Sequence, residues 1–463
     1  MKKLLLGSTA LVAGGLMAAP AMAADPIKIG VGGYYQFFAL AGSIEGVYAP
    51  SGESIQYKGI HFQQEGEIHF IGQTKLDNGT TIGLTVELEG WNAASTASST
   101  SGGGSVRQID EAFLFAFGDW GRLEVGSRDQ ASYRMFYGAP SALLGWGFFQ
   151  HNSNFNWASA AMLANPAQGA ATFYTIGGQF QDVNRVNYFT PRFYGLQIGV
   201  GYAPKINIVP NGQLARGLTN VGPGTQNASI CGFNDATTSS NCPTNDNSWQ
   251  DVFDVGANYL NKFGDVTIAL FGGFMYATFV PSFNQLAGNN ANLITGSNFT
   301  NWKQWVIGGQ FGFAGFTVGA SYSWDNNGLG GNYYTGADSD SRKVAVGVMY
   351  ETGPWQVSAG WGHVNTDNGN GAATLTNVTM GTTSALVFAP VPGSTSANFG
   401  TNPLTGAAVF GGYTADKFEV GVNYALGPGI KLVGGGIYWN VGGPVNGTQG
   451  QSWAAMLGMD LRF

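Results

Sequence analysis

The chain has 463 residues, of which 10% are charged and 13% aromatic, and it contains 73 glycines. The formal net charge is −7 and no basic face is evident, which argues against a nucleic-acid partner. So much glycine disfavours a mainly helical fold. No linker or shift in composition marks a boundary, so we expect one large domain.

The first 23 residues have the pattern of a secretory signal peptide. Two lysines after Met1 precede an apolar run from Leu4 to Ala19, and small residues at 21–23 offer a cleavage site. We predict a signal peptide over 1–23, whose removal takes the charge to −9, and a mature domain over 24–463. After this segment, no run approaches the about 20 apolar residues that a transmembrane helix needs.

The mature chain alternates apolar and polar residues in segments separated by turn signals such as Asp77-Asn78-Gly79. Alternation with a period of two gives a strand one apolar face and one polar face. In chain order, the predicted strands are Ile27–Ala41, Tyr57–Leu76, Thr80–Trp91, Val106–Phe117, Arg122–Asp129, Arg185–Phe189, Tyr194–Tyr202, Trp249–Leu260, Asp265–Val280, Asn301–Phe313, Phe316–Asp325, Arg342–Glu351, Trp355–Asn365, Tyr413–Leu426, Ile430–Val441 and a terminal strand that ends at Phe463.

Short connections between these strands alternate with long polar ones, such as 92–105, 131–184, 203–248 and 367–412. This sorting is typical of a barrel whose two rims face different compartments. We therefore predict an all-β fold: a transmembrane antiparallel β-barrel of about 16 strands, with short periplasmic turns and long external loops.

The charged residues test this prediction, because an outward Lys or Arg at the bilayer midplane costs roughly 2–4 kcal/mol. In the second and third strands, apolar residues share one parity, and the acids share the other, which we assign to the lumen. These lumen acids are Glu65, Glu67, Glu87 and Glu89. The fourth strand fails the test. Asp110 and Glu111 are adjacent, so one of the two carboxylates must point outward whichever face is the lumen face. A bulge or a subunit contact would hide that carboxylate from lipid.

The chain resembles the general porins of Gram-negative bacteria, through the turn Leu76–Gly79, the segment Arg122–Asp129 and the terminal Phe463. The resemblance implies an outer-membrane channel for passive diffusion of ions and small hydrophilic solutes. It also implies a homotrimer surrounded by outer-membrane lipid and lipopolysaccharide, without enzymatic activity, cofactor or catalytic residues. The lumen acids and the negative total charge predict a mild preference for cations.

In that family the third long loop folds into the lumen and narrows it. Here this loop is 131–184, and the predicted constriction residues are Arg122, Glu124, Arg128, Arg134, Asp182 and Arg185. The loop has almost no acid besides Asp182 but is rich in aromatics: Tyr133, Phe136, Tyr137, Trp146, Phe148, Phe149, Phe155 and Trp157. These rings either pack the loop against the wall or form a solute-selective aromatic track.

Three further interpretations concern other chemistry. An outer-membrane barrel enzyme is the rival class, but no Gly-x-Ser-x-Gly motif surrounds a serine. Asp- and Asn-rich pieces beginning at Asp325, Asp338 and Asp367 offer oxygen ligands for calcium at the mouth, although polar turns use the same residues. Cys231 and Cys242 lie eleven positions apart without neighbouring metal ligands, which predicts one local disulfide in an exported protein.

Overall fold

A computed structural model of the chain describes residues 26–48, 53–90, 109–144, 180, 182–205, 248–280, 301–326, 340–366, 379–380, 383–384, 413–442 and 449–463. The predicted signal peptide and the predicted disulfide lie outside these described residues. None of the helices in the described ranges has the length and apolar character to cross a membrane.

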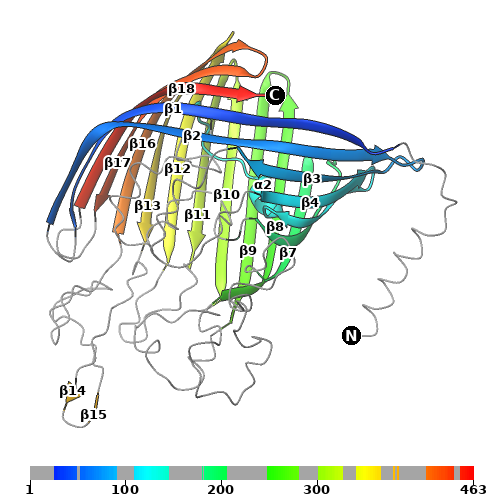
Figure 1. Ribbon diagram of the computed structural model, residues 1–463, viewed down its shortest axis with the longest axis horizontal. Helices are drawn as coiled ribbons and strands as arrows, with labels where there is room; N and C mark the ends of the chain where they lie inside the picture. The colour runs from blue at the N-terminus through cyan, green and yellow to red at the C-terminus, as the bar shows by residue number, and fades with distance from the viewer. Residues whose placement is uncertain are drawn as a thin grey trace, which may run out of the picture.

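Within these ranges, sixteen strands close into an antiparallel barrel (Figure 1). The strands are β1 (Lys28–Tyr48), β2 (Glu53–Lys75), β3 (Thr81–Glu89), β4 (Ile109–Gly118), β5 (Gly121–Arg128), β6 (Val183–Phe189), β7 (Leu196–Lys205), β8 (Ser248–Phe263), β9 (Val266–Val280), β10 (Trp302–Phe313), β11 (Phe316–Asp325), β12 (Ser341–Thr352), β13 (Trp355–Thr366), β16 (Tyr413–Gly427), β17 (Ile430–Gly442) and β18 (Gln449–Arg462). A separate two-stranded sheet pairs β14 (Thr379–Met380) with β15 (Thr383–Ser384).

Each barrel strand pairs with its neighbours along the chain, and β18 closes the ring against β1. At the closure, the amide of Gly33 donates to the carbonyl of Phe463 at 3.0 Å, and the amide of Phe463 donates to the carbonyl of Gly33 at 3.1 Å. The fold prediction is confirmed, and most strand ends agree with the predicted ones to within a few residues. The largest difference is in the first hairpin, where β1 continues to Tyr48 and β2 begins at Glu53.

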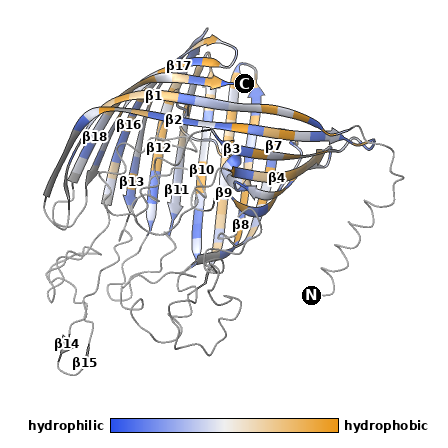
Figure 2. Ribbon diagram, in the orientation of Figure 1, coloured by the Kyte–Doolittle hydropathy of each residue, from blue (hydrophilic) through white to orange (hydrophobic). Residues whose placement is uncertain are grey.

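Residues of high and low hydropathy alternate along the strands (Figure 2), and the exposure of their side chains distinguishes the two faces of the wall. On β5 the outward Val125 is 45% exposed, whereas the adjacent Glu124 is 1% exposed. On β16 the outward Val420 is 58% exposed and the inward Glu419 is 2% exposed. Apolar side chains therefore cover the outside, whereas the inside carries these charged side chains together with buried apolar residues on β6 to β10.

The adjacent carboxylates of β4 are accommodated by a β-bulge. The register between β3 and β4 shifts between Val86 and Leu88, which pair with Ala112 and Ile109. Asp110 and Glu111 therefore stand together opposite Glu87 alone. The bulge breaks the alternation at this point, so the parity rule does not force either carboxylate into lipid.

Short turns join the strands at one rim. In the turn after β2, the amide of Leu76 donates to the carbonyl of Thr80 at 2.8 Å, and the side chain of Asn78 accepts the amide of Thr80 at 2.9 Å. Gly79 has a φ of 83°, a left-handed conformation that glycine adopts without a steric cost. The predicted Asp77-Asn78-Gly79 signal therefore forms the expected tight turn.

Candidate functional site

The segment Asp129–Leu144, which we call the lumen belt, leaves β5 and lies against the inner wall. It begins with the one-turn helix α2 (Ala131–Arg134), in which Ala131, Ser132 and Tyr133 are buried. The carboxylate of Asp254 on β8 accepts the amide of Ser132 at 2.7 Å. A negative charge at a free helix N-terminal amide is favourable, so the wall itself anchors the start of the belt.

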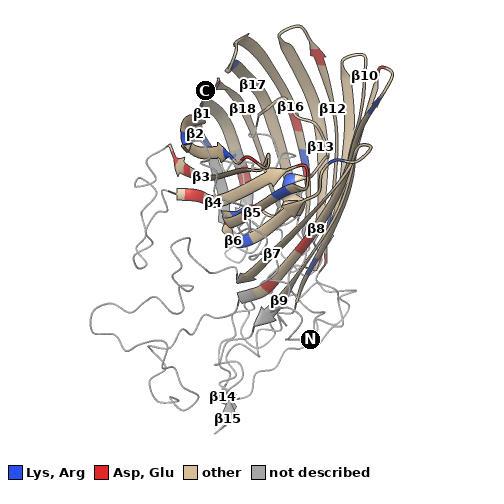
Figure 3. Ribbon diagram, turned by 90° about the vertical axis from the view of Figure 1, so that its right-hand side faces the viewer, with Lys and Arg blue, Asp and Glu red and all other residues tan. Residues whose placement is uncertain are grey.

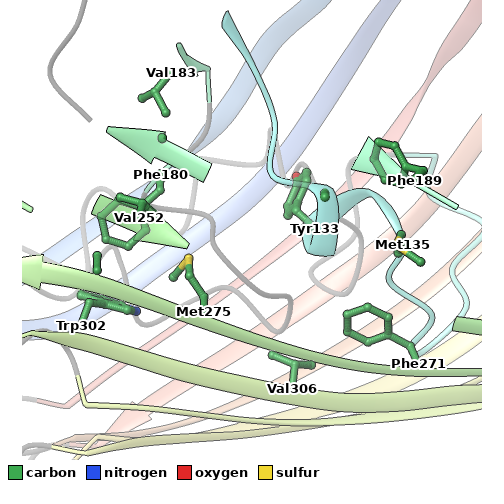
Figure 4. Close-up of a cluster of buried hydrophobic side chains, with 13 residues drawn as sticks. Tyr133, Met135, Phe180, Val183, Phe189, Val252, Phe271, Met275, Trp302 and Val306 are labelled. Carbon is green, nitrogen blue, oxygen red and sulfur yellow. The ribbon is translucent and has the colours of Figure 1, made fainter. Parts of the chain in front are cut away.

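Aromatic and apolar side chains of the belt pack against the wall of β6 to β10 (Figure 4). The ring of Phe136 meets that of Phe271 edge-on at 5.5 Å between centroids. Phe180, later in the same loop but outside the belt, meets Trp302 in the same way at 5.6 Å. Tyr133 is only 4% exposed. For the described aromatics of this loop, packing against the wall is therefore confirmed; Trp146, Phe148, Phe149, Phe155 and Trp157 lie outside the described residues.

Side-chain amides of the wall hold the belt's backbone carbonyls at intervals. The donor–acceptor pairs are Asn187 to Asp129 at 2.8 Å, Asn258 to Met135 at 3.1 Å, Gln310 to Gly138 at 2.9 Å, Asn423 to Ala142 at 3.0 Å and Gln36 to Leu144 at 2.9 Å. Ser358 of β13 accepts the amide of Ala142 at 2.8 Å. The donors lie on β6, β8, β10, β16 and β1, so the belt follows the wall around much of the barrel.

Glu124 of β5 lies at the centre of the predicted constriction residues. Its Oε1 accepts from Nε of Arg122 at 2.6 Å, and its Oε2 pairs with Arg134 of α2. Nε of Arg128 lies 3.9 Å from the same Oε2. One buried carboxylate therefore draws three arginines together, two from the wall and one from the belt.

The wall arginines also contact phenylalanines and acids of neighbouring strands. The guanidinium of Arg128 lies 4.4 Å from the ring centroid of Phe113, and that of Arg122 lies 4.7 Å from that of Phe115. Arg128 also pairs with Glu111, and its Nη1 lies 3.5 Å from Oε1 of Glu87. Stacking and ion pairing together restrict the arginines to positions along the wall.

Arg185 and Asp182 occupy a different position from the Glu124 cluster. The side chain of Arg185 is fully buried, pairs with Asp254 at 3.5 Å and donates to the carbonyl of Phe180. Asp182 lies just before β6, and its carbonyl accepts from the hydroxyl of Ser127 at 2.8 Å. Burial, together with Asp110 and Asp129, raises the pKa of Asp182 to about 8. Its carboxyl is therefore mainly protonated at neutral pH.

The predicted lumen acids lie on the inward faces of β2 and β3, with Glu67 opposite Glu89 and His69 opposite Glu87. Blue and red segments lie side by side on β3 to β6 in Figure 3. The hydroxyl of Tyr34 donates to Glu67 at 3.0 Å, and Nε2 of His69 lies 2.7 Å from the same carboxylate. Possible ligand atoms of Glu67, His69 and Glu87 lie within 4.8 Å of one another, as do those of Glu111, Asp129 and Asp182. Ion pairs with Arg128 already engage one acid of each group.

Lysines lie on the opposite wall. Lys343 of β12 pairs with Asp325 at 2.7 Å, and Lys417 of β16 lies 4.2 Å from the ring centroid of Trp439. Both lysines are 1% exposed. Of the acids predicted to hold calcium, Asp325 pairs with Lys343. Asp338 and Asp367 lie outside the described residues.

Sequence reasoning identified Arg122, Glu124, Arg128 and Arg134, which the structure brings into one cluster. It missed Glu111, Asp129 and Asp254, as well as the amide side chains that hold the belt. Inward parity on β8 marks Asp254 and Asn258 as lumen residues. Their partners come from a loop, whose path strand periodicity does not determine.

Comparison with known proteins places the chain in a family. The model of the Gram-negative porins matches residues 7–438, which is most of the chain. The chain belongs to the Gram-negative porin family. This porin is an outer-membrane channel protein, and its barrel lumen is the channel.

The similar proteins and solved structures share little sequence identity with this chain. An uncharacterised protein of Rickettsia conorii is 21% identical over 304 residues, which cover 61% of this chain and 67% of that protein. An anion-selective porin from Comamonas acidovorans is 10% identical with a TM-score of 0.49, covering 94% of this chain and all of the other. The outer-membrane-expressed OmpT of Vibrio cholerae is 10% identical with a TM-score of 0.46, covering 96% of this chain and 99% of the other.

Proposed function

We propose that this porin lets ions and small hydrophilic solutes diffuse passively through its lumen, with a preference for cations. The observation that carries the cation preference is the composition of the wall from β2 to β5. Glu65, Glu67 and Glu89 face inward there, in addition to Glu87, Glu111 and Glu124, which pair with Arg122 and Arg128. Their surplus negative charge raises the local concentration of cations.

Selection by size follows from the lumen belt, which takes up part of the cross-section inside the wall. Selection by charge follows from the mixed arginine and carboxylate surface beside it. Because the arginines pair with acids, we expect only a mild preference rather than strict cation selectivity. Diffusion down a gradient needs no covalent chemistry and no cofactor.

We also propose that the protein has no enzymatic activity. The described histidine side chains support this: His69 lies beside Glu67, and Nδ1 of His363 lies 2.9 Å from Oδ1 of Asp416. In both contacts the partner of the histidine is a carboxylate, whereas hydrolytic catalysis of the serine or cysteine type requires a serine or cysteine nucleophile beside the histidine. A purified preparation that hydrolyses lipid or peptide, and loses this activity when His363 is replaced, would contradict the proposal.

We also propose that the protein is a homotrimer surrounded by outer-membrane lipid and lipopolysaccharide. We further propose that it is exported with a signal peptide over 1–23, which is then cleaved. One similar structure, that of the Vibrio cholerae OmpT, is described as a trimer form. The outward apolar side chains, such as Leu457 at 67% and Phe62 at 61% exposure, require lipid or a partner subunit to cover them. The molar mass of the protein in detergent and its mature N-terminal sequence test these two points separately.

The reversal potential in a potassium chloride gradient across a planar bilayer tests the cation preference. We expect a value displaced toward the potassium equilibrium potential. The double variant Glu65→Gln, Glu89→Gln should reduce this displacement, whereas Glu351→Gln at the exposed end of β12 should leave it unchanged. A wild-type value of zero, or one displaced toward chloride, would refute the preference while leaving the channel intact.

A further inference from the structure

Inward-facing glycines of the wall lie directly beneath the lumen belt. A Cβ atom added at Gly256 of β8 would lie 2.9 Å from the Cα of Ser132. At Gly319 of β11 it would lie 2.9 Å from Cδ of Pro140, and at Gly347 of β12 it would lie 3.0 Å from the carbonyl oxygen of Pro140. Any larger residue at these positions would displace the belt or the wall.

Glycines of other wall strands, on β10, β16 and β17, also lie close to belt atoms. A Cβ at Gly308 of β10 would lie still closer to the carbonyl oxygen of Tyr137. At Gly421 of β16 and Gly435 of β17, it would lie 2.9 Å and 2.7 Å from side-chain carbons of Leu143. As the belt runs from Ser132 to Leu143, it therefore passes over the inner faces of successive strands from β8 to β17.

Many of these glycines are paired neighbours in the sheet. Gly256 pairs with Gly199 on one side and with Gly273 on the other. Gly319 pairs with Gly347, which pairs with Gly360, and Gly421 pairs with Gly435. We call six of the inward glycines that touch the belt the glycine lane: Gly256, Gly308, Gly319, Gly347, Gly421 and Gly435.

Glycine inside a strand weakens it, because the unfolded chain loses more freedom and no side chain packs on the sheet. A lane of such residues across several strands therefore requires a compensating contact. Close approach of another backbone is the usual reason for glycine at such a position. The amides of Gln310 and Asn423, which donate to belt carbonyls at 2.9 and 3.0 Å, supply the compensating hydrogen bonds.

We propose that the glycine lane and these amides hold the lumen belt flat against the wall, and so set the free width of the channel. The lane lies on β8 to β17, so the belt covers that side, and the open path runs along the charged wall of β2 to β5. The glycines and amides are positioning residues that act through the belt. This inference rests on the proposed diffusion function and specifies what determines its size limit.

Single-channel recording of Gly308→Ala and Gly319→Ala tests the lane. The added methyl group displaces the belt into the lumen, so we expect conductance to fall by roughly 1.5- to 2-fold, because ion flux depends on the free pore diameter. Uptake of a trisaccharide into proteoliposomes should fall more than that of a monosaccharide, while the reversal potential stays unchanged. The matched control is Gly272→Ala on β9, where nothing lies within 4 Å of the added methyl group, and it should behave as wild type.

Removal of the amides provides a second test that adds no bulk to the wall. In Gln310→Ala and Asn423→Ala, we expect rapid partial closures of the open channel as the belt leaves the wall, and fewer in Asn423→Gln, which keeps the donor. The control Gln197→Ala loses an amide that donates to Thr190 at the short-turn rim, away from the belt. If the wild type conducts and both sets of variants match their controls, the inference is wrong and diffusion stands; if the wild type never conducts, the diffusion proposal itself is wrong.

Discussion

At the scale of single residues, Glu124 is the acid that contacts three of the predicted constriction arginines. Its side chain is fully buried, and its two oxygens are shared among Arg122, Arg128 and Arg134. Loss of one partner from a buried ion pair typically costs about 3–5 kcal/mol, because a charge is left without compensation. We therefore expect Glu124 to affect both the stability of the wall and the charge that faces the channel.

Replacement of this carboxylate should change both properties. In Glu124→Gln, Arg122 and Arg134 lose this carboxylate, while Arg128 keeps Glu87 and Glu111. We expect a reversal potential displaced toward chloride and a lower midpoint of urea unfolding in detergent. Glu351→Gln removes one acid at the exposed end of β12 and serves as the control for net charge. An unchanged reversal potential in Glu124→Gln would show that the arginine cluster does not face the conducting path.

Asp182 predicts a pH dependence. Its pKa is raised to about 8, mainly by burial, so the carboxyl gains a negative charge only as the pH rises through about 8. The cation preference should therefore increase between pH 6 and pH 9. Because the folded state binds this proton more tightly than the unfolded chain, the stabilising contribution is present below about pH 4 and is lost as the pH rises toward 8.

The comparison of wild type with Asp182→Asn isolates this effect. Reversal potentials measured at pH 6 and pH 9 should differ more in the wild type than in the variant. Equal changes in both proteins would assign the pH dependence to another group.

How far the residues of the site are predictable depends on the element that carries them. Arg122, Glu124 and Arg128 follow from the alternation of β5, since a charge cannot face lipid without cost. The burial of Arg185 does not follow from the alternation, because one of its partners is the carbonyl of Phe180 in the loop before β6. Contacts made by a loop depend on its path in three dimensions, which strand periodicity does not contain.

At the scale of elements, alternation predicted the strands because each has one lipid-facing and one lumen-facing side. It failed where the pairing partner determines the structure. The extension of β1 to Tyr48 depends on residue-by-residue pairing with β2, and the bulge at Asp110 depends on the register with β3. Neither is a property of one segment alone.

The turn after β2 gives a prediction at this scale. Gly79 has a φ of 83° and open space around the position of an added methyl group, so Gly79→Ala introduces backbone strain without a clash. We expect a loss of about 1 kcal/mol in the free energy of unfolding, measured by urea titration in detergent. Gly272→Ala also adds a methyl group in open space, but without a left-handed φ. Equal stability of the two variants would contradict the explanation.

At the scale of the whole molecule, closure of the sheet accounts for the composition. A closed ring pairs backbone groups without leaving a free edge, which a protein in lipid requires. The terminal Phe463 takes part in this closure through its hydrogen bonds with Gly33. Few charges and many outward apolar side chains follow from a wall that is surrounded by hydrocarbon.

Single-channel recording of the purified mature protein in a planar bilayer tests the central claim most directly. A closed barrel with a belt held along one side of its lumen should leave a continuous water path, so we expect discrete conductance steps that grow with salt concentration. A preparation that is folded and β-rich by circular dichroism, inserts into the bilayer and produces no steps would contradict this account.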